Sequence, residues 1–336
     1  MQYPRYLLVG GSNSILKDGY GAMLQLQLPG HWCNQSLGNS SSLRGVEYLL
    51  NHQASLDQID QIFFEYTLND LIFEMSNTLD PITHLDWLQC LVSVEKIREK
   101  LIFVLLYGHG SGASSRINSG HSFVVDNYRK IISQFGVRSI DLFPLIRETV
   151  ETRGQAAVFK DNDHFTPHMV QALASSTIAE WTRFSVQPPL QFHESPKVNR
   201  KLVTINPLVD AHIHNATTHE FRTALLAAPL VKMTEASEIH FKSPGGALVG
   251  FYAIASHDAA CVRITYQQRE IVKAMRHRFG MAKPYLALRH LTTPLYTMPG
   301  EDILVRYTPD IFSVSNASLD NTMAQVINGG EPLAVV

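Results

Sequence analysis

The sequence has few charged residues and no long apolar run. Asp, Glu, Lys and Arg together make up 17% of the 336 residues, and the formal net charge is −2. A chain this close to neutral lacks the basic field with which proteins collect nucleic acid or anionic lipid. Its longest clear apolar run, residues 101–107, is far shorter than the roughly 18 residues that a membrane-spanning helix needs. We therefore expect no nucleic acid partner and no membrane span.

Cysteine is also scarce, and the usual patterns of metal ligands and export signals are missing. Cys33, Cys90 and Cys261 are odd in number and widely spaced, which is typical neither of a disulfide framework nor of a zinc site. The His212-x-His214 pair has the spacing of metal ligands, but no cluster of further ligands surrounds it. The N-terminus does not have the charged, apolar and small-residue sections of a secretory signal peptide. We expect free thiols, no metal and a cytoplasmic protein.

Residues 1–186 alternate between stretches of strand length and stretches with helical spacing. The apolar, strand-like runs are residues 5–9, 32–37, 61–66, 101–107 and 137–142. Between them, apolar residues recur on one helical face, as they do at Leu43, Val46 and Leu49. This alternation predicts an α/β domain in which helices cover both faces of a parallel sheet. Functional sites in such open sheets form at the carboxyl ends of the strands.

The pattern of strand-like and helical stretches changes after residue 186. The stretch 187–199 contains two proline-bearing segments and is predicted to be a linker. Short strand-like runs then follow one another without intervening helices, at residues 201–205, 238–241, 247–255, 261–266, 285–291 and 302–307. Residues 200–336 are therefore predicted to form a β-rich domain, most simply a sandwich, that holds substrate.

The first strand-like run ends in Gly10-Gly11-Ser12. The glycines permit a tight turn, and the turn would present the Ser12 hydroxyl at the carboxyl edge of the sheet. Ser14, two residues later, is an alternative nucleophile. A serine hydroxyl is a weak nucleophile until a base takes its proton, so a histidine is needed at the same edge.

A histidine of that kind follows the last strand-like run. His164 could act as the base, and a carboxylate could fix the tautomer of its ring. Asp161 is three residues earlier and could fold back onto the ring in a turn. Asp163 is the alternative, although adjacent side chains usually diverge.

Two further residues at strand ends could stabilise negative charge on a substrate oxygen. Asn69 comes just after the third run, and its side-chain amide could donate a hydrogen bond to an oxyanion. Gly38 comes after the second run and would offer a backbone N–H at the same edge. Together with the serine and the histidine, these residues make a consistent set for acyl transfer.

With this set the sequence resembles the SGNH hydrolases, also called the GDSL family. The four motif blocks of that family carry, in chain order, Ser, Gly, Asn and an Asp-x-x-His pair. The matching residues are Ser12, Gly38, Asn69 and Asp161 with His164. The resemblance covers about residues 3–185. Where the family usually has Asp before the serine, this chain has Gly11.

The resemblance implies a flavodoxin-like three-layer α/β fold for the first domain, and two-step acyl transfer as its chemistry. Ser12 would be the nucleophile, with His164 and Asp161 as its partners. The backbone N–H groups of Ser12 and Gly38, with the Asn69 amide, would form the oxyanion hole.

Several functions use this same set of residues. Members of the family that carry β-sandwich extensions often act on glycans, so we expect an O-acetyl esterase that acts on acylated carbohydrate or another small ester and needs no cofactor. One alternative is an O-acetyltransferase of surface polysaccharide biosynthesis, which would need an acyl donor such as acetyl-CoA. A third possibility is a glycan-binding protein without activity, against which the intact set of Ser12, Asn69, Asp161 and His164 argues.

Overall fold

The protein is described by a computed structural model that covers residues 3–108, 120–186, 202–222, 227–255, 261–274 and 285–308. The chain divides into two compact units. Unit 1 contains Met1–Met75 and Pro81–Leu202, and unit 2 contains Ser76–Asp80 and Val203–Val336. The expected linker, residues 187–199, lies outside the described residues, so its place and the exact domain boundaries remain predictions.

Unit 1 contains the parallel sheet that the sequence predicts. Its strands are β1 (Arg5–Gly10), β2 (His31–Asn34), β3 (Gln61–Glu65), β4 (Leu101–Leu105) and β5 (Arg138–Asp141), in the order β2-β1-β3-β4-β5. All four neighbouring pairs are parallel. Every residue of β3 and β4 is buried, as expected for central strands covered on both faces.

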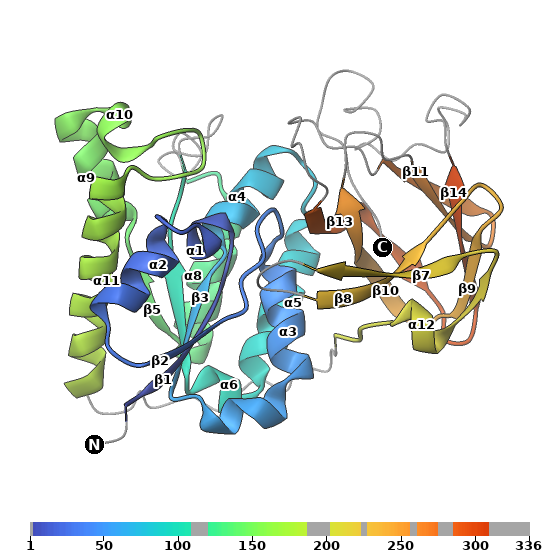
Figure 1. The fold of residues 1–336 in the computed structure, drawn as a ribbon, viewed down its shortest axis with the longest axis horizontal. Helices are drawn as coiled ribbons and strands as arrows, with labels where there is room; N and C mark the ends of the chain where they lie inside the picture. The colour runs from blue at the N-terminus through green and yellow to red at the C-terminus, as the bar shows by residue number, and fades with distance from the viewer. Residues whose placement is uncertain are drawn as a thin grey trace. The chain divides into compact units, whose positions relative to one another are not determined.

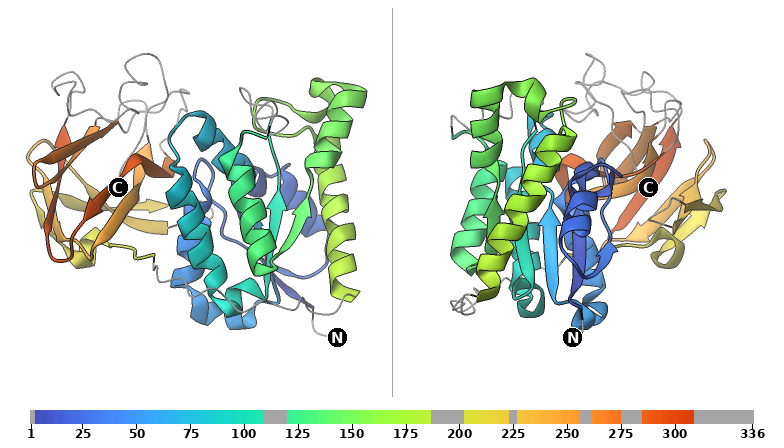
Figure 2. Two further views of the ribbon diagram at one scale, coloured as in Figure 1. Left: turned by 180° about the vertical axis from the view of Figure 1, so that it is seen from behind. Right: turned by 60° about the vertical axis from the view of Figure 1, so that its left-hand side comes forward.

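Helices cover both faces of this sheet, as Figures 1 and 2 show. They are α1 (Ser12–Ile15), α2 (Tyr20–Gln27), α3 (Ser42–Asn51), the 3₁₀ helix η1 (Gln53–Gln58), α4 (Thr67–Met75), α5 (Pro81–Ser93), α6 (Glu95–Arg98), α8 (Phe123–Phe135), α9 (Phe143–Arg153), α10 (Gln155–Val158) and α11 (Pro167–Val186). On one face, the ring of Tyr6 in β1 lies 5.8 Å from that of Trp181 in α11. On the other face, Phe103 of β4 lies 5.3 Å from Tyr128 of α8. The three-layer α/β fold is thereby confirmed.

Unit 2 is rich in antiparallel strands. Its elements are α12 (Pro207–Asp210), β6 (Ala211–His214), β7 (Thr217–Arg222), β8 (Ala227–Lys232), β9 (Glu238–Lys242), β10 (Gly246–Ala255), β11 (Cys261–Tyr266), β12 (Arg269–Ala274), β13 (Tyr285–Thr297) and β14 (Asp302–Thr308). One sheet has the order β12-β11-β14-β9-β6, and β10 pairs with β13 while β7 pairs with β8. Ile264 and Val305 of the five-stranded sheet share a hydrophobic cluster with Leu295 of β13 and Leu248 of β10. This cluster gives unit 2 a core of its own, as expected for packed sheets.

One strand prediction in unit 2 is wrong, and four strands were missed. Residues 202–205 form no regular structure, although a strand was expected over 201–205. The chain there leads into α12, where the Asn206 side chain accepts a hydrogen bond from the Leu208 N–H and Pro207 occupies the first turn. The missed strands are β6, β7, β8 and β12. A short apolar run becomes a strand only where a neighbouring strand takes its hydrogen bonds, and sequence patterns do not show that neighbour.

Three further observations concern the cysteines, membrane-spanning helices and metal ligands. The cysteines Cys33, Cys90 and Cys261 are all free. Within the described ranges, no helix has both the length and the apolar character to cross a membrane. Among the same residues, no group of three or more His, Cys, Asp and Glu side chains is placed to hold a metal ion.

Candidate active site

The nucleophile candidate lies in the sharp connection between β1 and α1. Ser12 is the first residue of α1, and its Oγ lies 3.1 Å from Nε2 of His164. The two preceding glycines allow this packing. A Cβ on Gly10 would lie 2.4 Å from Ser14 Oγ, and one on Gly11 would lie 1.9 Å from Asn69 Oδ1. No side chain fits at either position without displacing its neighbours.

The histidine is held by the turn that precedes α11. Its Nδ1 lies 2.9 Å from both carboxylate oxygens of Asp161. Asp161 Oδ1 also accepts hydrogen bonds from the backbone N–H groups of Asp163 and His164, each at 2.9 Å. Partial burial alone would raise the pKa of Asp161, but these N–H groups and the imidazole outweigh it and hold the pKa below its usual value. An ionised carboxylate accepts the Nδ1 proton, which leaves the Nε2 lone pair of His164 directed at Ser12.

The structure distinguishes between the alternatives that the sequence left open. Ser14 is buried, and its hydroxyl donates to Glu65 Oε2 at 2.8 Å rather than pointing at His164. Asp163 contributes its backbone, because its N–H donates to Asp161 and its carbonyl oxygen accepts from Asn13 Nδ2 at 2.9 Å. The geometry therefore brings together Ser12, His164 and Asp161.

The expected oxyanion-hole residues lie beside Ser12. A Cβ built on Gly38 would be 3.7 Å from both Cα and Cβ of Ser12, so the two backbones are adjacent. The N–H of Ser12 lies at the start of α1 and has no intrahelical acceptor. Asn69 lies in the first turn of α4 and packs against Gly11. One N–H of its amide donates to the Ser40 carbonyl at 2.9 Å, and the other has no acceptor among the described residues.

Three residues that hold the serine loop were not recognised from the sequence. The Asn13 side chain joins the loop to the histidine turn through the Asp163 carbonyl. At the end of β2, Asn34 Nδ2 donates to the Ser14 carbonyl at 2.7 Å. Glu65, which ends β3, is fully buried and binds the Ser14 hydroxyl. A sequence signal did exist for Glu65, since a carboxylate at the end of an apolar run is costly to bury unless it has a partner.

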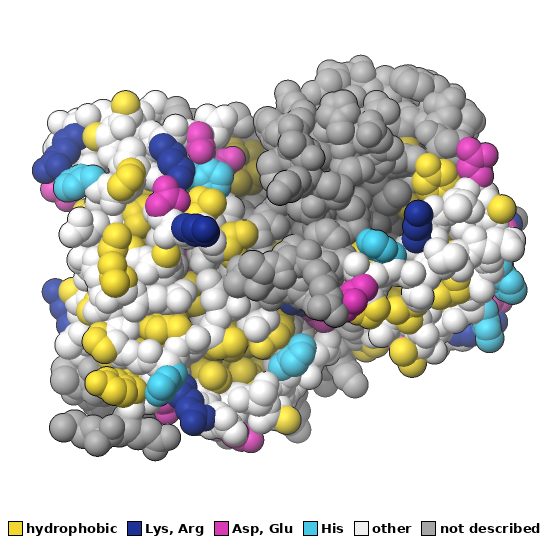
Figure 3. All heavy atoms as spheres, viewed as in Figure 1, with side chains coloured by type: hydrophobic (Ala, Val, Ile, Leu, Met, Phe, Trp, Pro, Cys, Tyr) yellow, Lys and Arg dark blue, Asp and Glu magenta, His cyan; other side chains and the backbone are white. Residues whose placement is uncertain are grey.

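Charges of both signs surround the candidate site. Lys160 Nζ lies 3.4 Å from Asp18 Oδ2, and both side chains are at least one-third exposed. Figure 3 shows acidic, basic and histidine side chains together on the part of unit 1 that carries α1 and α10. Among the described residues, charges of both signs therefore lie near the candidate site.

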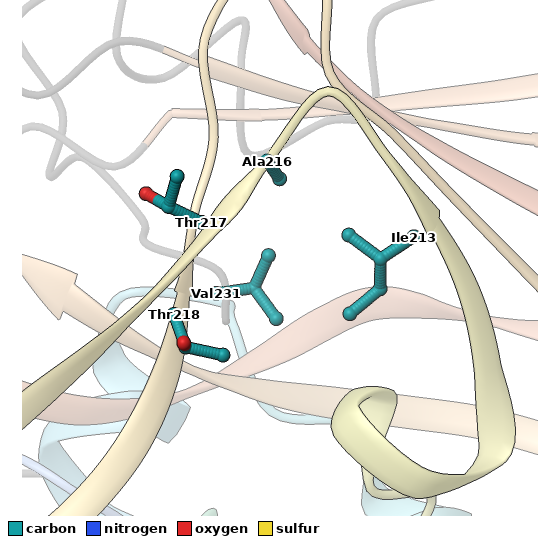
Figure 4. A pocket seen from close by; sticks show the side chains of 5 residues that line it. All are labelled: Ile213, Ala216, Thr217, Thr218 and Val231. Carbon is teal, nitrogen blue, oxygen red and sulfur yellow. The ribbon is translucent and has the colours of Figure 1, made fainter.

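A separate cavity of about 370 Å³ lies in unit 2. Its lining residues, shown in Figure 4, are Ile213, Ala216, Thr217, Thr218 and Val231. These side chains are aliphatic or carry a hydroxyl, so they offer no general base and no metal ligand.

Comparisons with solved structures agree with this architecture. No model of a protein family matches the sequence, and no curated protein matches it either. The crystal structure of a two-domain esterase (CEX) active on acetylated mannans is similar over 91% of this chain and 86% of that chain, with 12% identity and a TM-score of 0.66. The structure of such an esterase co-crystallized with mannopentaose is similar over 91% and 85%, with 13% identity and a TM-score of 0.62. A lipase/acylhydrolase from Enterococcus faecalis matches over 56% of this chain and 99% of that chain, with 15% identity and a TM-score of 0.43.

At this level of identity the likeness concerns the fold. It extends over nine-tenths of the chain and so includes the β-rich part as well as the parallel sheet. The chain has an SGNH hydrolase fold in unit 1 followed by a β-rich unit 2, the architecture of the two-domain esterase to which it is similar.

Proposed function

We propose that the protein is a serine-dependent esterase that removes O-acetyl groups from carbohydrate. The observation that carries this proposal is the 3.1 Å contact between Ser12 Oγ and His164 Nε2, with Asp161 on the other side of the ring. A nucleophile, a base and a group that orients the base are the three parts that activate a serine.

The chemistry follows from the positions of these groups. His164 Nε2 takes the Ser12 proton as Oγ attacks the ester carbonyl carbon, and the carbonyl oxygen becomes an oxyanion. The N–H groups of Ser12 and Gly38 and the Asn69 amide donate to that oxygen. Each such donor typically contributes about 2.7–4 kcal/mol to the transition state.

The acyl-enzyme is formed and then broken by the same base. His164 gives its proton to the leaving alkoxide, which departs as the alcohol. It then takes a proton from water as the water oxygen attacks the acyl carbon. As the bond to Oγ breaks, His164 returns that proton to Ser12 Oγ, and acetate leaves with Ser12 free.

The substrate class is supported by the likeness to the two-domain esterase active on acetylated mannans, which extends over both units. Unit 2 has a hydrophobic core of its own, and we assign it to holding the polymer. Binding energy from sugar residues remote from the ester could then be used to orient the acetyl group at Ser12.

The test is hydrolysis of p-nitrophenyl acetate and of an acetylated glycan by the full chain and two serine variants. Ser12→Ala should release no acetate above background, whereas its melting temperature should stay close to that of the wild type. Ser175→Ala, which changes an exposed serine on α11, is the matched control and should retain full activity.

The outcome also separates the possible acceptors. Acetate release that needs only water supports the esterase. Acetylated sugar that forms from an added acceptor would identify an acetyltransferase instead, and a Ser12→Ala variant with wild-type activity would contradict both.

A further inference from the structure

Glu65 is a buried carboxyl group directly behind the nucleophile loop. It is the last residue of β3 and has no exposed surface. Its Oε2 accepts the hydroxyl of Ser14 at 2.8 Å, and its backbone oxygen accepts the N–H of Gly11 at 3.0 Å. These two bonds attach to the chain on either side of Ser12, so Glu65 holds the loop at both ends of the nucleophile.

The surrounding atoms are arranged around this carboxyl group. A Cβ on Gly10 would lie 3.0 Å from Glu65 Oε2 and 2.4 Å from Ser14 Oγ, so the glycine leaves the space that the pair occupies. The second carboxyl oxygen, Oε1, is buried and has no hydrogen-bond partner among the described residues. Burying a polar group without full pairing destabilises the fold, so we expect this carboxyl group to have a role that offsets that cost.

We propose that Glu65 is a positioning residue of the active site, whose carboxyl group holds Ser12 against His164 by accepting the hydroxyl of Ser14 on the nucleophile loop. The proposal rests on the proposed function, because it assumes that Ser12 is the nucleophile. Glu65 itself does not touch the reacting atoms.

The surroundings of Glu65 favour the neutral form. Burial raises its pKa to about 7, and the negative charge of Asp70 acts in the same direction, while hydrogen bonds from Ser14 and Gly11 partly offset both. The other titratable groups that interact with it are Tyr20, Tyr66 and Tyr128, whose own pKa values are raised well above neutrality by burial. Of Glu65 and these three tyrosines, the carboxyl of Glu65 is thus the one that changes charge near pH 7.

The raised pKa of Glu65 makes the stability of the folded protein depend on pH. Because Glu65 ionises near pH 4.5 when unfolded and near 7 when folded, its contribution to stability is present in acid and lost as the pH rises through 7. The Ser14 hydroxyl can donate to the carboxylate as well as to the neutral acid, so this hydrogen bond persists when Glu65 ionises. Alignment of Ser12 should therefore depend on the acceptor oxygen of residue 65 and not on its charge.

The experiment measures the rate at which a fluorophosphonate labels Ser12, and kcat and KM for p-nitrophenyl acetate, from pH 5.5 to 8.5. Glu65→Gln keeps the shape and an acceptor oxygen but cannot ionise. We expect Glu65→Gln to be labelled within about twofold of the wild-type rate across this range, because its amide oxygen still accepts the Ser14 hydroxyl. Glu65→Leu removes the acceptor and should lower kcat by at least about tenfold at every pH, with KM little changed.

Glu74→Gln is the matched control. Glu74 is also buried in unit 1, but it binds Ser122 and the N–H of Phe123 at the start of α8. Its variant should lower the melting temperature and leave the rate of labelling at Ser12 unchanged. A Glu65→Leu variant that reacts at the wild-type rate, or a loss in Glu65→Leu that Glu65→Gln shares in full, overturns the proposal. Wild-type protein that is not labelled at Ser12 at any pH contradicts the proposed function as well, so the two failures are distinguishable.

Discussion

At the scale of single residues, hydrogen bonds decide which of two nearby carboxylates supports His164. Asp161 reaches the ring because the turn folds it back, and the same oxygen accepts two backbone N–H groups. Asp163 contributes only backbone groups to these particular bonds. The two aspartates therefore offer a matched pair of substitutions.

We predict that Asp161→Asn lowers kcat by roughly 10²- to 10⁴-fold with little change in KM, because an amide can donate to Nδ1 and favour the wrong tautomer of His164. Asp163→Asn should retain most of the activity, because the backbone groups that it supplies are unaltered. Steady-state kinetics on p-nitrophenyl acetate measure both. Equal losses in the two variants would show that the turn, and not the carboxylate, is what matters.

At the scale of elements, the β1–α1 connection is packed so closely that its glycines cannot be replaced. Gly11 lies against the Asn69 side chain. At the position of Gly11, the SGNH family usually has Asp. The loop is instead held from β2, β3 and the histidine turn, by Asn34, Glu65 and Asp163. Its support thus comes from three elements that are distant from it in the sequence.

This packing leads to a prediction that runs against the family pattern. Gly11→Asp should lower kcat and destabilise the fold by about 1–3 kcal/mol, since a Cβ 1.9 Å from Asn69 Oδ1 must displace that side chain. Gly11→Ala should show the same loss in milder form. Thermal melts and acetate release test this prediction. A Gly11→Asp variant more active than the wild type would show that the loop can accommodate a side chain at this position.

At the scale of the whole molecule, each unit has a hydrophobic core of its own. In unit 1 the core lies on both faces of the parallel sheet, and in unit 2 it lies between strands of different sheets. A segment of this size with a core of its own can fold independently.

We therefore expect a fragment of residues 1–186 to fold and to cleave p-nitrophenyl acetate, while its activity on an acetylated polymer falls sharply. Without the second unit, sugar residues far from the ester no longer contribute binding energy. This lowers activity on the polymer but not on the small ester. Circular dichroism and the two assays measure this. An unfolded fragment would show that the two units share one core, and equal loss of both activities would show that the second unit is needed for the chemistry.

Much of unit 1 could be predicted from the sequence, because its signals are local. Strand β4 is a continuous apolar run, and β1 and β3 have apolar interiors; such runs form buried parallel strands wherever helices cover both faces. In unit 2 the strand β6 was missed because its alternation, Ala-His-Ile-His, is short and includes histidines. Such a strand is stabilised by β9 beside it, and a pattern read along one segment does not contain that neighbour.

By itself the sequence determined the five strands of unit 1, their alternation with helices and the set of groups at one edge of the sheet, since parallel strands bring their carboxyl ends together. Only the tertiary structure decided that Ser14 turns toward Glu65 while Ser12 faces His164. Serines two residues apart are chemically equal in the sequence. Their difference arises from contacts with residues more than 50 positions away, and such contacts exist only once the chain has folded.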